Sequence, residues 1–182
     1  WNTSEECYLG WERKRGLLNQ FNEYILGKSK SKFLINTIEN SKEKFGQIPN
    51  IKYVITLDSD TELCLNTGLE MIGAMAHILN RPVLNHKQDL VIDGHGLIQP
   101  RVGISLEDIQ KSYFTKLYAG SGGKDAYTNA ISDIYQDNFE EGIFTGKGIY
   151  DLPVFSAVLA NEIPENTVLS HDLLEGSYLR CG

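Results

Sequence analysis

Hydrophobic and polar positions along the chain follow two different periods. In residues 12–26 and 61–79 the apolar side chains recur every three to four positions, which predicts two helices that each bury one face. Between them, a strand is expected at residues 51–57, where the apolar run that begins at Tyr53 is typical of a buried parallel strand. A helix, a strand and a helix in this order indicate an α/β domain.

The rest of the chain continues this alternation. Further helices are expected at residues 105–118, 127–139, 153–160 and 170–181. Short strands are expected within residues 83–102, in a mixed sheet or a hairpin, and at residues 143–145. Residues 28–50 are polar and predict a surface loop or a weak strand. We therefore expect an α/β fold in which helices flank a mixed sheet.

Composition narrows the classes of protein. The 182 residues are 41% hydrophobic and 23% charged, as in a soluble, single-domain globular protein. Three cysteines without a CxxC spacing argue against a disulfide scaffold and a zinc site, and fit a reducing compartment. The net charge of −7 argues against a nucleic-acid partner. No apolar run is long enough to span a membrane, so we expect no membrane contact by this segment itself.

The two ends suggest a piece of a larger protein. The chain starts at Trp1, without an initiator Met or a signal peptide, and it stops at Gly182 inside a predicted helix. We expect residues 1–182 to be one partial domain.

Two carboxylates follow the apolar run directly, at Asp58 and Asp60. Side chains at the carboxyl end of a strand lie where ligands collect in open α/β sheets, and paired carboxylates suit a divalent cation that carries phosphates. The alternative is a turn that caps the next helix at Thr61. An EF-hand is excluded, because Leu63 and Leu69 occupy the positions of its glycine and glutamate.

A basic cluster, Lys14-Arg15-Gly16, lies near the start of the first predicted helix, where cations oppose the helix dipole. A bound diphosphate would explain the cations, and Gly16 would let its oxygens approach the backbone. A solvated basic turn is the alternative. Residues 133–175 are, by contrast, acidic. The basic and the acidic segment could line the two ends of one cleft, or each could form a solvated surface.

Two later motifs also carry possible chemistry. Gly146-Lys147-Gly148 lacks the ending of a P-loop, but its glycines allow close approach of a sugar or pyrophosphate; an ordinary hairpin turn is equally compatible. Ser170-His171-Asp172 predicts a helix cap at Ser170 followed by first-turn acids. Asp172 is a candidate general base, and His171 could assist it or bind a metal. A serine hydrolase is unsupported, because no Gly-x-Ser-x-Gly elbow occurs.

Seven sequence blocks together resemble the glycosyltransferase segment of cyclic β-1,2-glucan synthetases (glycosyltransferase family 84), which is similar to the inverting family-2 glycan synthases. The blocks are Trp-Glu-Arg-Lys-Arg-Gly (11–16), Tyr-Val-Ile-Thr-Leu-Asp-x-Asp-Thr (53–61), Met-Ala-His-x-Leu-Asn-Arg-Pro (75–82), Gly-x-Ile-Gln-Pro-Arg-Val (96–102), Ser-Asp-x-Tyr-Gln-Asp (132–137), Gly-Lys-Gly-Ile-Tyr-Asp (146–151) and Leu-Ser-His-Asp-Leu-Leu-Glu-Gly (169–176).

The resemblance implies a GT-A-like fold, UDP-glucose as donor, a Mg²⁺ or Mn²⁺ ion and a growing β-glucan acceptor. It assigns metal and diphosphate binding to Asp58 and Asp60 and the role of general base to Asp172. The implied nucleotide-binding residues are Lys14, Arg15 and Asn19, and the implied acceptor or sugar-binding residues are Gln99, Arg101, Gly146, Lys147, Gly148 and His171.

Two departures from the family pattern qualify this assignment. His171 replaces a glutamate of related synthases, and the family's first nucleotide-binding strand and a later Gln-x-x-Arg-Trp-like element do not occur in residues 1–182. The resemblance also implies further domains and a full-length protein at the cytoplasmic face of the bacterial inner membrane. A non-catalytic glycan- or nucleotide-binding module and a metal-dependent phosphohydrolase are the alternative functions.

Overall fold

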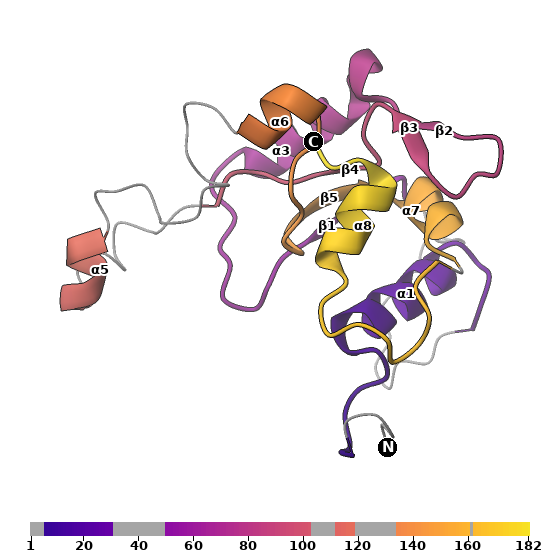
Figure 1. Cartoon of the computed structure of the whole chain (residues 1–182), viewed down its shortest axis with the longest axis horizontal. Coiled ribbons are helices and arrows are strands. Elements are labelled where there is room, and N and C mark those ends of the chain that lie inside the picture. Colours follow the sequence, from indigo (N-terminus) through magenta and orange to yellow (C-terminus); the bar gives the residue numbers. More distant parts are fainter. Residues whose placement is uncertain (1–5, 31–49, 103–111, 119–133, 161) are drawn as a thin grey trace, which may run out of the picture.

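A three-layer arrangement organises the chain in the computed structural model, which describes residues 6–30, 50–102, 112–118, 134–160 and 162–182 (Figure 1). The middle layer is a sheet in the order β1–β5–β4. Its strands are β1 (Tyr53–Thr56), β5 (Gly148–Asp151) and β4 (Leu97–Ile98). Helix α3 (Thr67–Ala76) covers one face; α1 (Arg13–Ile25), α7 (Leu152–Val158) and α8 (Asp172–Leu179) lie on the other.

Successive side chains along a strand point to opposite faces of this sheet. On β5, Ile149 packs with Met71 and Met75 of α3, whereas the next residue, Tyr150, joins the larger core on the opposite face. Successive residues of a strand point to opposite sides, so one buried strand serves both layers. All four residues of β5 are buried, as expected for the central strand.

The larger core fixes the helices that later form the site. The Tyr150 ring stacks on Phe155 of α7 with centroids 4.2 Å apart, and its hydroxyl donates to Asn22 Oδ1 of α1 at 2.8 Å. Leu179 of α8 is fully buried in the same cluster. Helices α1, α7 and α8 are therefore anchored to one strand.

The remaining described elements are short. Strands β2 (Val83–Leu84) and β3 (Val91–Asp93) form an antiparallel hairpin next to the 3₁₀ helix η1 (Ile78–Asn80). Helix α6 (Ile134–Phe139) lies near the sheet, while α5 (Tyr113–Tyr118) stands apart from the other elements (Figure 1). None of the described helices has the length and apolar character needed to cross a membrane.

The α/β character and the helices near residues 12–26, 153–160 and 170–181 are confirmed, but the predicted parallel pairing and mixed sheet are wrong. Strand β1 runs antiparallel to β5, with Thr56 opposite Gly148, and every strand pair within the described ranges is antiparallel. A continuous apolar run does not encode the direction of its partner strand. The run is also only half-buried, apart from Thr56. The finer GT-A assignment stays a prediction.

Two predicted elements have different bounds. Helix α3 starts at Thr67 rather than residue 61, because Asn66 has a left-handed backbone (φ 68°) that cannot continue a helix. The predicted strand at 143–145 is wrong. There the backbone N–H of Thr145 donates to the side-chain oxygen of Gln99 at 2.5 Å instead of joining a strand ladder. The expectations for residues 31–49, 105–111 and 119–133 lie outside the described residues.

Candidate functional site

The antiparallel pairing of β1 and β5 assembles a charged centre. It places the chain that leaves β1, with Asp58, beside the chain that enters β5, with Gly146 and Lys147. Lys14 Nζ, from α1, lies 2.6 Å from Asp58 Oδ1 and donates to the Gly146 carbonyl oxygen at 2.8 Å. Lys147 Nζ lies 2.9 Å from the other carboxylate oxygen, Asp58 Oδ2. Two ammonium groups therefore flank one carboxylate.

These contacts set the charge state of Asp58. Hydrogen bonds from Lys14 and then Lys147 lower the pKa of the Asp58 carboxyl group, and its slight burial only partly opposes them. Asp58 is consequently ionised at neutral pH, and the three groups carry one net positive charge. This is a suitable electrostatic setting for an anion such as a diphosphate.

Gly146 connects this centre to the start of α8. Its φ of +82° lies in the left-handed region, which favours glycine. A Cβ atom at this position would lie 3.0 Å from Asp172 Oδ1 and 3.1 Å from Oδ2. The Gly146 backbone and the Asp172 carboxylate are therefore in direct contact, and a side chain at residue 146 would displace the carboxylate.

Three titratable side chains gather at the N-terminal end of α8. His171 Nδ1 lies 2.8 Å from Glu175 Oε1 and 3.6 Å from Asp172 Oδ1. Glu175 is only 2% exposed, and this burial raises the pKa of its carboxyl group, which the close contact with His171 opposes. Helix α8 approaches the preceding segment closely, since a Cβ at Gly176 would lie 2.9 Å from Phe144 Cβ.

A cavity of about 300 Å³ lies between the start of α1 and the segment that enters α8. Such a volume is at the lower end of the range for small-molecule sites. Its lining is formed by Leu9, Glu12, Arg13, Lys14, Arg15, Asp58, Thr145, Asn166, Thr167, Val168, Leu169, Ser170, His171 and Asp172.

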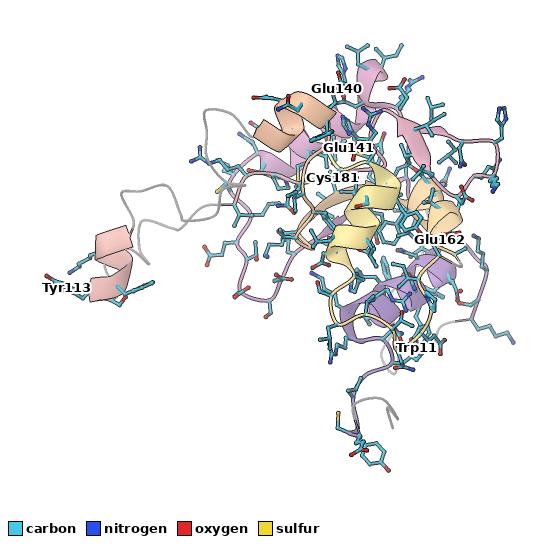
Figure 2. The ribbon with its side chains drawn as sticks, in the orientation of Figure 1. Trp11, Tyr113, Glu140, Glu141, Glu162 and Cys181 are labelled. Carbon is cyan, nitrogen blue, oxygen red and sulfur yellow. The ribbon has the colours of Figure 1, made fainter. Side chains whose placement is uncertain are left out.

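The start of α1 also holds residues 162–171 in place. The Asn166 backbone N–H donates to Glu12 Oε1 at 2.7 Å, Arg15 Nη1 donates to the Ile163 carbonyl at 3.1 Å, and Arg13 Nη1 donates to the Leu169 carbonyl at 3.2 Å. Trp11 is labelled at this end of α1 in Figure 2. Residues 12–15 therefore have two roles: Lys14 contacts Asp58, whereas its neighbours bind residues 162–171.

Comparison with known proteins supports the resemblance seen in the sequence. The chain is 42% identical over 183 aligned residues, which cover 100% of it, to the cyclic β-(1,2)-glucan synthase NdvB of Rhizobium meliloti (strain 1021). The whole chain is similar to a segment of this synthase. It spans about 6% of the length of that relative. No protein-family model matches the chain.

The structure brings together most of the residues that the resemblance to the synthase implies. Lys14, Arg15, Asp58, His171 and Asp172 all line the cavity. Gly146 and Lys147 contact Asp58 or its partner lysine, so they lie at the charged centre. Gly148 is buried in β5.

Gly146, Lys147 and Gly148 are not among the residues that line the cavity, and neither are the other four implied residues. Asp60 is exposed within the turn that the hydrogen bond from Thr61 N–H to the Asp58 carbonyl closes. Asn19 is half-buried on α1, and Arg101 is exposed after β4. Gln99 accepts hydrogen bonds from the backbone and the hydroxyl of Thr145, so it supports the chain before Gly146.

Three local interpretations need correction. Gly16 does not face a ligand: it is buried, and a Cβ there would lie 1.9 Å from the Trp11 carbonyl oxygen. The N-cap of α8 is His171, not Ser170, and its side chain makes no capping hydrogen bond. The predicted cap for a helix at Thr61 is also wrong, because α3 starts later.

Sequence reasoning missed Glu12, Arg13 and Glu175 as parts of this site. Glu175 had a detectable signal, because it lies four residues after His171 and such residues share one face of a helix. Glu12 and Arg13 had none, since their contacts with residues 166 and 169 span most of the chain.

The resemblance implies a divalent cation, for which the carboxylate of Asp58 is the candidate ligand at the cavity. Asp58 is ionised and lies at the cavity, but each of its two oxygens already contacts an ammonium group, so a divalent cation could bind there only by displacing Lys14 or Lys147. Magnesium commonly uses one or two carboxylates and completes its coordination with phosphates and water. The ligand atoms of His171, Asp172 and Glu175 also lie within 4.8 Å of one another, and His171 Nδ1 is buried without a hydrogen-bond partner among the described residues.

Proposed function

We propose that this chain forms the reaction site of a glucosyltransferase that moves glucose from UDP-glucose to a growing β-1,2-glucan with inversion. The observation that carries the proposal is that Lys14, Asp58 and Asp172 line one cavity, while Lys147 contacts Asp58 beside it. The similarity to a glucan synthase agrees with this chemistry. The site offers a cationic end for a leaving diphosphate and an anionic end for an attacking hydroxyl.

The ammonium groups of Lys14 and Lys147 would bind the diphosphate of the donor. Both lie within 3 Å of Asp58, so the carboxylate holds them side by side. Fixed cations stabilise the negative charge that develops on the leaving diphosphate in the transition state, and they need little rearrangement.

Asp172 would act as the general base. Its carboxylate lines the cavity, and Gly146 separates it from the two-lysine centre. The acceptor hydroxyl gives its proton to an Asp172 oxygen while its own oxygen forms the new bond to C1 of glucose. The bond between C1 and the diphosphate oxygen breaks in the same displacement, and UDP leaves with that electron pair.

Asp58 and Asp60 are the residues that would hold a Mg²⁺ or Mn²⁺ ion. When bound, the ion would supply positive charge to the leaving diphosphate. The remaining partners follow from the similarity to the synthase and are part of this proposal: a β-glucan acceptor, further domains of a longer protein, and a location at the cytoplasmic face of the inner membrane.

Calorimetric titration of UDP, with and without Mn²⁺, tests the donor site. We expect metal-dependent binding that Asp58→Ala and Asp60→Ala both abolish. Glycan binding without any UDP binding would instead support a binding module. Release of phosphate from UDP-glucose without sugar transfer would support a phosphohydrolase and contradict the proposal.

A further inference from the structure

Glu175 is a buried carboxylate that the proposed reaction does not use. It is 2% exposed and lies one helical turn after His171 on α8. A buried carboxylate is expensive to maintain and is often replaceable by an apolar side chain without loss of stability. Its presence beside a reaction site therefore calls for a specific role.

The contact with His171 indicates that role. His171 Nδ1 is buried and makes no hydrogen bond of good geometry among the described residues, and its nearest carboxylate oxygen is Glu175 Oε1 at 2.8 Å. The His171 side chain nevertheless lines the cavity and is 12% exposed. The exposed part of the ring is therefore not Nδ1, and Nε2 is the polar atom that remains for a ligand.

We propose that Glu175 is a positioning residue, which holds the proton of His171 on Nδ1 so that the lone pair of Nε2 accepts a hydrogen bond from a hydroxyl of the acceptor sugar beside Asp172. This inference rests on the proposed glucosyl transfer. A carboxylate that accepts a hydrogen bond from one ring nitrogen fixes both the tautomer and the orientation of a histidine. The attacking sugar is then held by two neighbouring side chains, His171 and Asp172.

The surroundings of Glu175 act on its charge in opposite directions. Burial raises the pKa of its carboxyl group, whereas the close contact with His171 and, more weakly, the charge of Arg15 on α1 lower it. The neighbouring Tyr150 hydroxyl is neutral, because burial raises the pKa of this group. A metal ion shared by His171, Asp172 and Glu175 is the alternative use of this cluster, because their ligand atoms lie within 4.8 Å of one another.

Steady-state kinetics of the full-length transferase test the inference through two variants. Glu175→Gln keeps the shape but removes the charge. His171→Asn keeps a nitrogen near Nδ1 but removes Nε2 from the cavity. For each we expect kcat to fall by about 10- to 100-fold, the usual cost of losing such a supporting contact, with the donor KM changed by less than about two-fold. Ser177→Ala is the control, because its exposed hydroxyl bonds only the Leu173 carbonyl.

The double variant separates positioning from a structural role. If Glu175 acts through His171, combining the two changes lowers kcat no further than the worse single change. Wild-type kcat in Glu175→Gln, or a double loss equal to the product of the single losses, would overturn the inference. If the unmodified protein transfers no glucose at all, the proposed function fails rather than the role of Glu175.

Discussion

Replacing Gly146 with alanine should damage both stability and glucosyl transfer. With φ at +82°, residue 146 has a left-handed backbone, which costs an L-residue about 1–2 kcal/mol. For a domain of this size, such a loss lowers the melting temperature by about 2–8 °C. The new Cβ would also lie 3.0–3.2 Å from three atoms of the Asp172 carboxyl group, closer than ordinary van der Waals contact.

The second effect acts on the proposed base. To relieve this contact, the Asp172 carboxylate must move by a few tenths of an ångström. Since a displacement of about 1 Å can cost 100-fold in rate, we expect kcat to fall by roughly 3- to 10-fold. Thermal unfolding measures the first effect, and radiolabelled glucose transfer measures the second.

Gly27→Ala is the matched control. Gly27 has a similar φ of +71°, but no atom lies within 4 Å of a Cβ placed there. It should lose comparable stability and keep its full kcat. Equal kcat in both variants would refute the reasoning that Gly146 makes room for the Asp172 carboxylate.

Three further predictions concern single contacts. Lys147→Gln should weaken UDP binding about 10-fold by calorimetry, because one charged hydrogen-bond donor is lost; unchanged affinity would exclude Lys147 from the diphosphate site. Tyr150→Phe should lower the free energy of unfolding in urea by about 1–3 kcal/mol, because it leaves Asn22 Oδ1 buried without its donor, and equal stability would contradict this. Because Lys14 and Lys147 lower the pKa of Asp58, its contribution to stability is complete above its unfolded pKa of about 3.9 and is lost as the pH falls through the lower folded value. In Asp58→Asn, the free energy of unfolding, measured by urea titration, should therefore fall less between roughly pH 5 and pH 2 than in the unmodified protein. An equal fall in both proteins would count against the lysine contacts.

The sequence predicted the ingredients of the site better than their arrangement. Local patterns were sufficient for α1, α7 and α8, whose apolar periodicity and Gly or Pro boundaries are encoded in adjacent residues. They could not reveal that β1 pairs antiparallel with β5, because that choice depends on residues about 90 positions away.

The antiparallel pairing of β1 and β5 also decides which group a cation contacts. Lys147 was assigned to the acceptor, yet it contacts Asp58 because Thr56 lies opposite Gly148. Arg15 was assigned to the nucleotide, yet its buried guanidinium is engaged by Glu12 and the Ile163 carbonyl. Charge and spacing identified segments that meet in the fold, but only the tertiary contacts show which group each cation binds.

Glucose transfer by the full-length protein, with Asp172→Asn as its partner variant, tests the central claim most directly. The assay supplies radiolabelled UDP-glucose and a β-1,2-glucan acceptor, and calorimetry measures UDP binding in parallel. We predict transfer by the unmodified protein, and a loss of about 100-fold or more in Asp172→Asn with UDP affinity retained. Transfer at the full rate by Asp172→Asn would contradict the assignment of this cavity as the reaction site.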